Sequence, residues 1–456
     1  MRTLLLCSTV LLPFAARAAT TFPVPQQSAG VPAGAIDVLA VLPQADASTD
    51  YTVVINQALA QGRTLFFRAT GTPYRYTPPI ILGAHSALVG QPGVVLAAYG
   101  TARLQTFSVP AGANGASIDG ITFDGTHAAQ YPAICRAAGF RMRGGGMTHT
   151  NALILGQGCD GAVVQDGKYS WSSSVAIGIN GGNHDAVLHN QIETPKVFAI
   201  DAGAGSGFFR VDDNWTTTYT GAEFFAAFVE SHDGEVANNS SVNAGDNGMS
   251  FSGTNIRATN NRISHALSAS IAIYGDRNTI TGNRLVDGGQ VLNPDARPLT
   301  FCDGSTKAVF HSPGYGTGPQ PALNLVGAFG GYAQLNTLRD NTVDDDQPVP
   351  TQAGLYVGAG QRPWTAGSYS HSAYVYVNGS TWRTEVAGTS TVAPSGRTDF
   401  ADPHGTAVWQ WVSVPSLGQQ EPAGNRIGPN RIGRTASYRF RSSIPDNANM
   451  FAGPHP

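Results

Sequence analysis

The sequence predicts an all-β chain wound into a right-handed parallel β-helix solenoid, with three short strands in each turn of the coil. The first supporting observation is a recurring pattern: an apolar residue, two further residues and an asparagine. The second is the regular spacing of that asparagine, and the third is composition. Only 12% of the residues are charged, whereas 55 of 456 are glycine. Such a composition suits a β structure with many turns.

The asparagine recurs with a period of 22–25 residues. A period in this range is typical of a solenoid. Leucine is too sparse for a leucine-rich repeat, and segments such as "MSFSG" (249–253) alternate with period two, not with the 3.6-residue period of a helix. A parallel β-helix is the remaining solution. The series consists of Asn190, Asn214, Asn239, Asn261 and Asn283, at intervals of 24, 25, 22 and 22 residues.

Equivalent residues of neighbouring coils stack about 4.8 Å apart in a parallel β-helix. We therefore predict that the asparagines form one hydrogen-bonded ladder along a turn of the coil. Cys135 and Cys159 are 24 residues apart, which is one coil, so they stack as neighbours. A disulfide and a pair of buried free thiols both fit this spacing. Cys302 is left unpaired in the count.

Over residues 35–345, and again near 424–441, the chain resembles the right-handed parallel β-helix proteins of the pectate-lyase-like superfamily. The segment "DYTVVINQALAQGRTLFFRATGTPYRY" (50–76) reads as a short amphipathic helix, a strand and a turn. That order is similar to the N-terminal cap of this superfamily, here expected over about residues 50–80. The resemblance implies a coil closed by a capping helix and a carbohydrate-active protein, without indicating one family.

Residues 1–18 have the pattern of a signal peptide: Arg2, a short apolar run and a cleavage site at Ala16–Ala18. We therefore expect a secreted or periplasmic protein. The apolar run is too short to span a bilayer, and no later run reaches that length. The net charge of −3 leaves no basic face for nucleic acid. A polysaccharide partner is what the resemblance implies.

The repeat is interrupted twice. Residues 288–335 are rich in proline and glycine and are predicted to form a long loop beside a substrate groove. Residues 350–415 are predicted to form a β-rich inserted module, because they alternate like antiparallel hairpins. Its tryptophans, Trp382, Trp409 and Trp411, either stack on sugars or pack the core of the module. Residues 424–441 then predict a final coil.

Candidate catalytic residues follow from aligning one strand of consecutive coils. Aligning "FAID" (198–201) with "AFVE" (227–230) places Asp201 and Glu230 on adjacent coils, about 5 Å apart. Two carboxylates this close raise one pKa, as acid–base catalysis requires. The sequence therefore predicts a catalytic pair on the outward face. The whole outward column is Asn180, Asp201, Glu230, Ser252 and Tyr274.

Other polar residues lie near these strands and complete the predicted site. Tyr274, His232 and His265 are further catalytic candidates. Asp201, Glu230 and Asp246 would hold Ca²⁺ if the reaction depends on it. The predicted substrate-binding residues are Lys196, Glu223, Arg257 and Arg277.

Three functions are compatible with these residues. The resemblance implies a polysaccharide lyase, which removes the C5 proton of a uronate and is slightly favoured. An Asp/Glu pair would equally serve a glycoside hydrolase or an intramolecular glycosyl transferase. A non-catalytic glycan-binding adhesin or matrix protein is the third. Only three lysines in the chain argue mildly against a strongly anionic substrate. The sequence has no Ser-His-Asp spacing, nucleotide-binding glycine loop or H-E-x-x-H motif.

Overall fold

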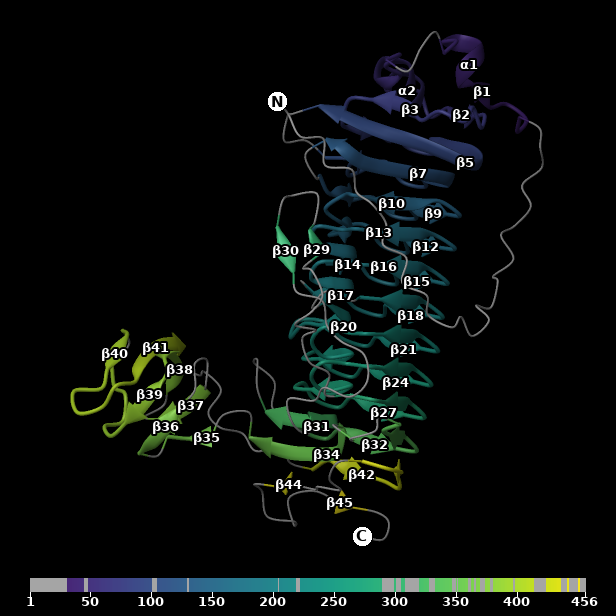
Figure 1. Ribbon diagram of the computed structural model, residues 1–456. Helices are drawn as coiled ribbons and strands as arrows, with labels where there is room; N and C mark the ends of the chain where they lie inside the picture. The colour runs from purple at the N-terminus through teal and green to yellow at the C-terminus, as the bar shows by residue number, and fades with distance from the viewer. Residues whose placement is uncertain are drawn as a thin grey trace.

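The computed structural model shows a parallel β-solenoid of about 9 turns, which confirms the predicted β-helix (Figure 1). The structure describes residues 31–44, 48–100, 105–128, 131–203, 205–218, 222–288, 299–300, 305–307, 320–327, 333–346, 350, 352–359, 362–364, 366–369, 374–377, 380–396, 398–413, 424–435, 441–442 and 450–451. The predicted signal peptide (1–18) and Cys302 lie outside these residues.

Each regular coil contributes two short strands to one sheet, called sheet A, and one strand to a second sheet, called sheet B. Strands of consecutive coils pair in parallel, as β14 does with β17. The strands of sheet B are β4 (Ile80–Ile81), β6 (Phe107–Val109), β8 (Ala133–Cys135), β11 (Leu153–Gly156), β14 (Val175–Asn180), β17 (Phe198–Gly203), β20 (Glu223–Ala227), β23 (Met249–Phe251), β26 (Ile271–Ile273), β31 (Gln320–Gly327), β34 (Gln352–Ala359) and β44 (Arg441–Ser442).

Sheet A runs the whole length of the coil. Its strands are β1 (Ile36–Asp37), β2 (Thr64–Phe67), β3 (Tyr74–Tyr76), β5 (Ala87–Gly100), β7 (Ser117–Ala128), β9 (Arg141–Arg143), β10 (Gly146–Thr148), β12 (Val163–Gln165), β13 (Lys168–Ser170), β15 (Ala186–Leu188), β16 (Gln191–Glu193), β18 (Arg210–Asp212), β19 (Trp215–Thr217), β21 (Glu235–Ala237), β22 (Ser240–Val242), β24 (Arg257–Thr259), β25 (Arg262–Ser264), β27 (Thr279–Thr281), β28 (Arg284–Val286), β32 (Thr337–Arg339), β33 (Thr342–Asp344), β42 (Arg426–Ile427), β43 (Arg431–Ile432) and β45 (Met450–Phe451).

The core fills the inside of the coil. Because side chains alternate along a strand, Ile200 and Ala202 of β17 point inward and are fully buried, whereas Asp201 between them points outward. The same inward positions in the next coils are Phe225 and Ala227, then Met249 and Phe251. Sheet B therefore presents its outward residues as columns that cross the coils.

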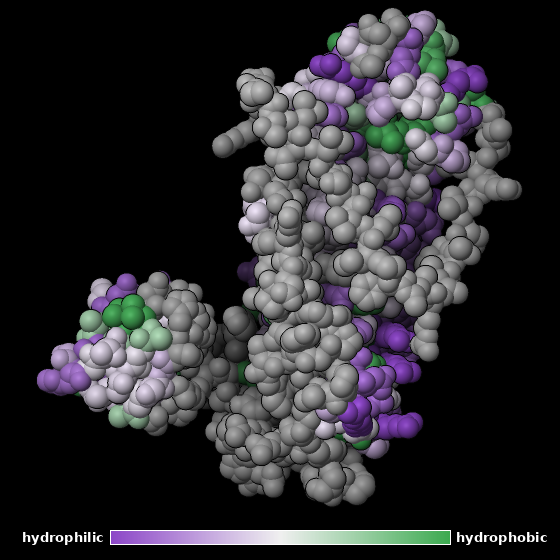
Figure 2. Space-filling view, in the orientation of Figure 1, coloured by the Kyte–Doolittle hydropathy of each residue, from purple (hydrophilic) through white to green (hydrophobic). Residues whose placement is uncertain are grey.

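The turns explain the abundance of Asn, Asp and Gly. From Asn190 to Asn341, the residue before the ladder asparagine adopts a positive φ, as His189 (53°), Asp213 (51°) and Asn238 (55°) do. Asn, Asp and Gly adopt this left-handed conformation at the least steric cost. In Figure 2, hydrophilic residues gather along the flank of the coil beside β12 to β27.

The asparagine ladder is confirmed. The backbone N–H and the Nδ2 of Asn190 both donate to Asn214 Oδ1, at 2.9 and 3.0 Å. Asn214 Nδ2 also donates to the Val187 carbonyl at 2.9 Å, so each side chain joins neighbouring coils. The ladder continues beyond Asn283 to Asn341 and Asn430. Each rung satisfies backbone groups that the turn leaves buried.

A second ladder was not predicted from the sequence. Asn278 donates its backbone N–H to Asn336 Oδ1 at 2.7 Å, and Asn336 donates to Asn425 Oδ1 at 2.8 Å. The sequence intervals are 58 and 89 residues. Inserted segments lengthen these coils, and for that reason the short period hides this ladder.

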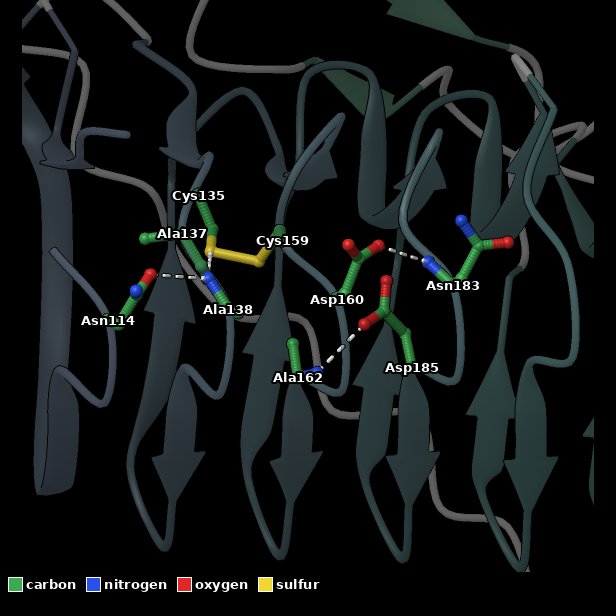
Figure 3. Close-up of a disulfide and its surroundings, with 9 residues drawn as sticks. All are labelled: Asn114, Cys135, Ala137, Ala138, Cys159, Asp160, Ala162, Asn183 and Asp185. Atoms are coloured by element: carbon green, nitrogen blue, oxygen red, sulfur yellow. Dashed lines mark hydrogen bonds between the residues drawn. A yellow bond between two sulfur atoms is a disulfide. The ribbon is translucent and has the colours of Figure 1, made fainter. Parts of the chain in front are cut away.

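Cys135 and Cys159 form a disulfide with their Cα atoms 5.6 Å apart, so of the two alternatives the disulfide is correct (Figure 3). Both cysteines are fully buried. Figure 3 also shows how the adjoining turns are joined: Ala138 N–H donates to Asn114 Oδ1. The disulfide ties this coil to the next one, and Gly139 N–H also donates to the Asp160 carbonyl of that next coil at 2.8 Å.

The predicted N-terminal capping helix is confirmed as α2 (Thr52–Ala60), which follows a single helical turn, α1 (Val38–Val41). Ile55 and Leu59 are fully buried and belong to the core of the coil. Asp50 Oδ1 accepts the Thr52 N–H at 2.8 Å and satisfies one free donor of the first turn. The helix thus covers apolar residues at the first coil.

The predicted module (350–415) starts too early, because Gln352–Ala359 form β34, a strand of sheet B that pairs with β31. The rest of it consists of small, mainly antiparallel sheets that Figure 1 shows apart from the coil. Trp382 and Trp409 are fully buried with Tyr369 and Val375, so these two tryptophans pack the core of the module rather than stack on sugars. The side chain of Trp411 lies outside the described residues. The strands are β35 (Arg362–Pro363), β36 (Gly367–Tyr369), β37 (Tyr374–Val377), β38 (Ser380–Val386), β39 (Gly388–Ser390), β40 (Phe400–Ala401) and β41 (Val408–Ser413).

One part of the predicted loop 288–335 is wrong. Residues 320–327 form β31, a regular strand of sheet B that pairs with β26 and β34. Inside the interruption, β29 (Leu299–Thr300) and β30 (Thr306–Lys307) form an antiparallel pair. Residues 289–298, 301–304, 308–319 and 328–332 of the predicted loop lie outside the described residues. Within the described part of the chain, no helix is long and apolar enough to cross a membrane.

Candidate active site

The predicted Asp201–Glu230 pair is wrong. In the register of β17 and β20, Asp201 lies opposite Ala226. Glu230 comes four residues later, exposed in the turn after β20. The error came from starting the strand at Ala227, whereas β20 begins at Glu223. Asp201 and Glu230 therefore do not share the outward column that the strand alignment predicted.

The structure instead brings Glu223 next to Asp246: the N–H of Gly245, the residue before Asp246, donates to the carbonyl of Ala222, the residue before Glu223, at 3.0 Å. Glu223 is 7% exposed, and its carboxyl accepts hydrogen bonds from Asn247 Nδ2 at 3.0 Å and from Ser250 Oγ at 2.5 Å. Both partners lie in the next coil. Asp246 precedes Asn247 and is exposed to solvent. A buried carboxyl and an exposed carboxylate thus meet where the strands of sheet B begin.

This environment changes the acidity of Glu223. Burial, and then the negative charge of Asp246, raises the pKa of Glu223 to about 7, although the hydrogen bonds from Ser250 and Asn247 act in the opposite direction. Near neutral pH, Glu223 therefore exists in both protonation states, which is the condition for a general acid or base. Two carboxyl groups in unlike surroundings are a typical acid–base arrangement.

Tyr274 joins the same group. Its backbone continues β26, and its phenol makes a hydrogen bond with Asn247. Burial, followed by the charges of Glu223 and Asp246, raises the pKa of Tyr274, so the phenol stays protonated and can donate a hydrogen bond. Asn247 thereby links the Glu223 carboxyl to the Tyr274 phenol. The sequence analysis placed Tyr274 in one column with Asp201 and Glu230, whereas the structure places its phenol beside Glu223 and Asp246.

Aromatic side chains flank the carboxyl groups. Phe198 is the backbone partner of Glu223 in the neighbouring strand. Its ring meets the ring of Phe228 edge to face, with centroids 5.6 Å apart. Lys196, predicted to bind substrate, lies in the turn before Phe198, where its backbone N–H donates to the Ser172 carbonyl at 3.0 Å.

Asp201 lies on the same outward face, but its surroundings differ. It is 6% exposed, and Oδ1 has no hydrogen-bond partner among the described residues. Burial alone raises the pKa of Asp201 to about 7. Charge on Glu223 is not among the causes, so the two carboxyl groups are not a coupled pair. Asp201 is thus a separate feature of this face.

The two predicted histidines lie elsewhere. His232 follows β20 in the turn toward sheet A, where Nδ1 is 2.9 Å from Asp233 Oδ2. His265 lies in the turn after β25, with Nε2 3.4 Å from Asp287 Oδ2, and burial lowers its pKa. Each histidine has its own acidic neighbour, and neither is brought to Glu223. The structure therefore gives no support to catalytic roles for His232 and His265.

Arg257 and Arg277 also lie off the site. Arg257 begins β24 in sheet A, between Glu235 and Thr279 of the neighbouring coils. Arg277 occupies the turn between the sheets with a φ of 57°. Arg257 belongs to an exposed stack of residues on sheet A, where ion pairs contribute little to stability. The predicted substrate contacts of these two arginines are not supported.

The predicted Ca²⁺ ligands do not fit a common site. The register separates Asp201 from Glu230, and Asp246 is instead the neighbour of Glu223. In the described ranges, no group of three or more His, Cys, Asp or Glu side chains is arranged to hold a metal ion. No reaction step is therefore derived through Ca²⁺.

Asn247 and Ser250 were missed by the sequence analysis, and Glu223 was given only a binding role. The spacing of the asparagine ladder would have predicted the correct register of these strands. Asn214 and Asn239 are 25 residues apart, and so are Asp201 and its true partner Ala226. The predicted pairing of Asp201 with Glu230 required 29 residues, which the ladder interval already excludes.

Comparisons with known proteins returned only distant structural similarities. No protein-family model matches the sequence, and no curated protein matches it. The mannuronan C-5 epimerase AlgE6 A-module of Azotobacter vinelandii is similar at 12% identity and a TM-score of 0.49, over 72% of this chain and 100% of that one. The catalytic domain of a GH87 alpha-1,3-glucanase in complex with nigerose is similar at 12% identity and a TM-score of 0.49, over 94% of this chain and 69% of that one. Similarities this low carry no argument about chemistry, so function is argued from the residues of the site.

Proposed function

We propose that this protein is a secreted glycoside hydrolase in which Glu223 is the general acid and Asp246 is its carboxylate partner. One observation carries the proposal: a buried carboxyl with a pKa of about 7 lies beside an exposed carboxylate on the outward face of a sheet. Glycosidases use two carboxyl groups with these unlike properties.

The chemistry follows from the two environments. Protonated Glu223 donates its proton to the glycosidic oxygen, and the sugar becomes an oxocarbenium-like cation. Asp246, ionised and reachable from solvent, stabilises that cation, either as nucleophile or as base toward a water molecule. If Asp246 is the nucleophile, water then cleaves the glycosyl ester of Asp246 while Glu223 takes a proton from that water. If Asp246 is the base, it takes the proton of the attacking water and passes it to solvent, and Glu223 is reprotonated from solvent.

Three neighbours support these roles. Asn247 and Ser250 hold the two oxygens of the Glu223 carboxyl in a fixed direction. Tyr274 remains a hydrogen-bond donor at neutral pH because its pKa is raised, so its phenol is suited to bind a sugar hydroxyl. Residues held in this way reduce the reorganisation needed to reach the transition state.

The lyase is the weaker alternative for this site. A lyase must neutralise the carboxylate of a uronate before it removes the C5 proton. The site gathers the acidic residues Glu223 and Asp246, with Lys196 in the turn before Phe198. The predicted arginines Arg257 and Arg277 lie on other parts of the coil. A negative site repels a uronate. A neutral glycan fits these charges better.

The test is to incubate the protein with neutral and uronate-containing exopolysaccharides and to analyse the products. New reducing ends without unsaturated uronate are expected, and ultraviolet absorbance from unsaturated uronate would instead identify a lyase. Glu223→Gln should lower turnover by about 10²-fold or more. Glu230→Gln is the matched control, because Glu230 is exposed and off the site. Equal activity of the two variants, or no product from any glycan, would overturn the proposal.

A further inference from the structure

Two glycines leave room for polar side chains beside Asp201. In the register of β14 and β17, Gly178 lies opposite Asp201, and Asn180 lies opposite Gly203. A Cβ added to Gly178 would be 2.7 Å from both Asn180 Nδ2 and Asp201 Oδ1. The Asn180 carboxamide and the Asp201 carboxyl therefore converge over Gly178, and any larger residue there would displace them.

Asp201 brings an unused hydrogen-bonding group to this place. Its Oδ1 is buried without a hydrogen-bond partner among the described residues, and the residue as a whole is only 6% exposed. A buried polar atom without a partner destabilises the fold unless something satisfies it. The carboxyl does not belong to either asparagine ladder, so the architecture of the coil does not explain it.

An aromatic ring borders the same place. A Cβ added to Gly203 would be 3.1 Å from Phe228 Cδ2 and 3.2 Å from Asn180 Oδ1. Phe228 is 43% exposed, and its edge-to-face contact with Phe198 holds the ring in position. An exposed apolar face beside a few convergent polar groups is typical of a small-ligand site.

We propose that Asp201, Asn180 and Phe228 form a subsite that binds one neutral sugar unit of the glycan. The apolar face of the sugar ring packs on Phe228, and the hydroxyl groups at its edge hydrogen-bond Asn180 and the Asp201 carboxyl. The ligand class, a glycan, rests on the proposed function, whereas the subsite itself is argued from the three side chains and two glycines.

The chemistry of the subsite selects against acidic sugars. The carboxylate of a uronate would lie against the buried Asp201 carboxyl. This unfavourable contact selects against a uronate and in favour of a neutral sugar. Burial raises the pKa of Asp201 to about 7, so near neutral pH the carboxyl both donates to and accepts from a sugar hydroxyl. A neutral sugar is therefore the preferred occupant.

The subsite is within reach of the candidate catalytic pair. Glu223 pairs with Phe198, which lies three residues before Asp201 on the neighbouring strand. Three residues of a strand span about 10 Å. Both groups lie on the outward face of sheet B, and the contact between Phe198 and Phe228 connects them. One glycan chain lying on this face would contact both.

The test measures binding apart from catalysis. Calorimetric titrations use the Glu223→Gln variant and a panel of tetrasaccharides: glucose units with α-1,3, β-1,3, α-1,4 and β-1,4 linkages, galacturonate units and mannuronate units. We expect one of the neutral tetrasaccharides to bind most tightly. Adding Asn180→Ala or Phe228→Ala should weaken that binding by about 10-fold or more. Phe208→Ala is the matched control, because Phe208 is a phenylalanine that is 52% exposed on a turn of the same coil.

The outcomes separate this inference from the proposed function. Unchanged affinity in both the Asn180→Ala and Phe228→Ala variants would overturn the subsite, even if wild-type protein hydrolyses glycans. Tightest binding of a uronate tetrasaccharide, or no binding of any member of the panel, would also overturn it. Binding of a neutral glycan that depends on Asn180 and Phe228, without hydrolysis by wild-type protein, would leave the subsite in place and remove the proposed function.

Discussion

Asp246 lies beside Glu223, so that an exposed carboxylate borders a buried carboxyl at the start of two neighbouring strands. The charge of Asp246 disfavours ionisation of Glu223, whereas the hydrogen bonds from Asn247 and Ser250 favour it. The acidity of Glu223 is therefore set by opposing effects that individual substitutions can separate.

The first prediction concerns the pH profile of hydrolysis. If protonated Glu223 is the acid, kcat should fall as pH rises through about 7, the pKa of this carboxyl. Glu223→Gln should remove this dependence together with most of the activity. The measurement is kcat between pH 5 and 9 for both proteins. A wild-type profile that stays flat from pH 5 to 9 would exclude Glu223 as the acid.

The second prediction is that two substitutions shift the pKa of Glu223 in opposite directions. Ser250→Ala removes a hydrogen bond that lowers the pKa of Glu223, so its pKa should rise. Asp246→Asn removes a charge that raises it, so the pKa should fall. Carboxyl-carbon NMR titration of Glu223 measures both without relying on turnover. Shifts in the same direction would contradict the arrangement of charges described for the site.

The sequence predicted the ladder correctly and the catalytic pair wrongly, for one physical reason. Asn190 and its successors occupy one turn position and hydrogen-bond one another from coil to coil, so their spacing reports the coil directly. Asp201 lies in a strand of small and apolar residues, where period-two alternation fits several registers. Only backbone pairing fixes which one forms. The hydrogen bond between Glu223 and Asn247 depends on that register, and the residue pattern of a single strand does not predict it.

The third prediction concerns the stability of the fold against pH. The pKa of Asp201 rises from 3.8 to about 7 on folding, so between these values the folded state binds more protons than the unfolded state. The free energy of unfolding therefore decreases as pH rises from about 4 to 7. Asp201→Asn should remove about 3–4 kcal/mol of this decrease. Urea unfolding at pH 4 and pH 7 tests this, and an equal pH dependence in both proteins would contradict it.

The fourth prediction concerns the disulfide. The Cys135–Cys159 bond closes a segment of 24 residues. Restricting the unfolded chain over such a length is worth about 3 kcal/mol in the loop-entropy model. Replacing both cysteines by alanine should lower the free energy of unfolding by about that amount. The control is the reduced wild-type protein, which should resemble the double variant; equal stability of the oxidised and reduced proteins would be the contrary result.

The fifth prediction distinguishes the stability contributed by the hydrogen bonds of the asparagine ladder from that of the turn conformation beside it. Asn261 is 1% exposed, and its side chain accepts from Asn239 and donates to the Val236 carbonyl. Asn261→Leu leaves those backbone groups unpaired and should destabilise the protein by about 1–3 kcal/mol.

Asn260, its neighbour in the chain, supplies the control for the ladder experiment. It adopts a φ of 56°, and glycine already occupies the equivalent turn position in the next coil, at Gly282 with a φ of 68°. Because glycine adopts this conformation without strain, Asn260→Gly should change the free energy of unfolding by less than about 1 kcal/mol. Denaturant unfolding of both variants decides the matter. If Asn260→Gly proved as costly as Asn261→Leu, the stabilisation would lie in the turn conformation rather than in the stacked side chains.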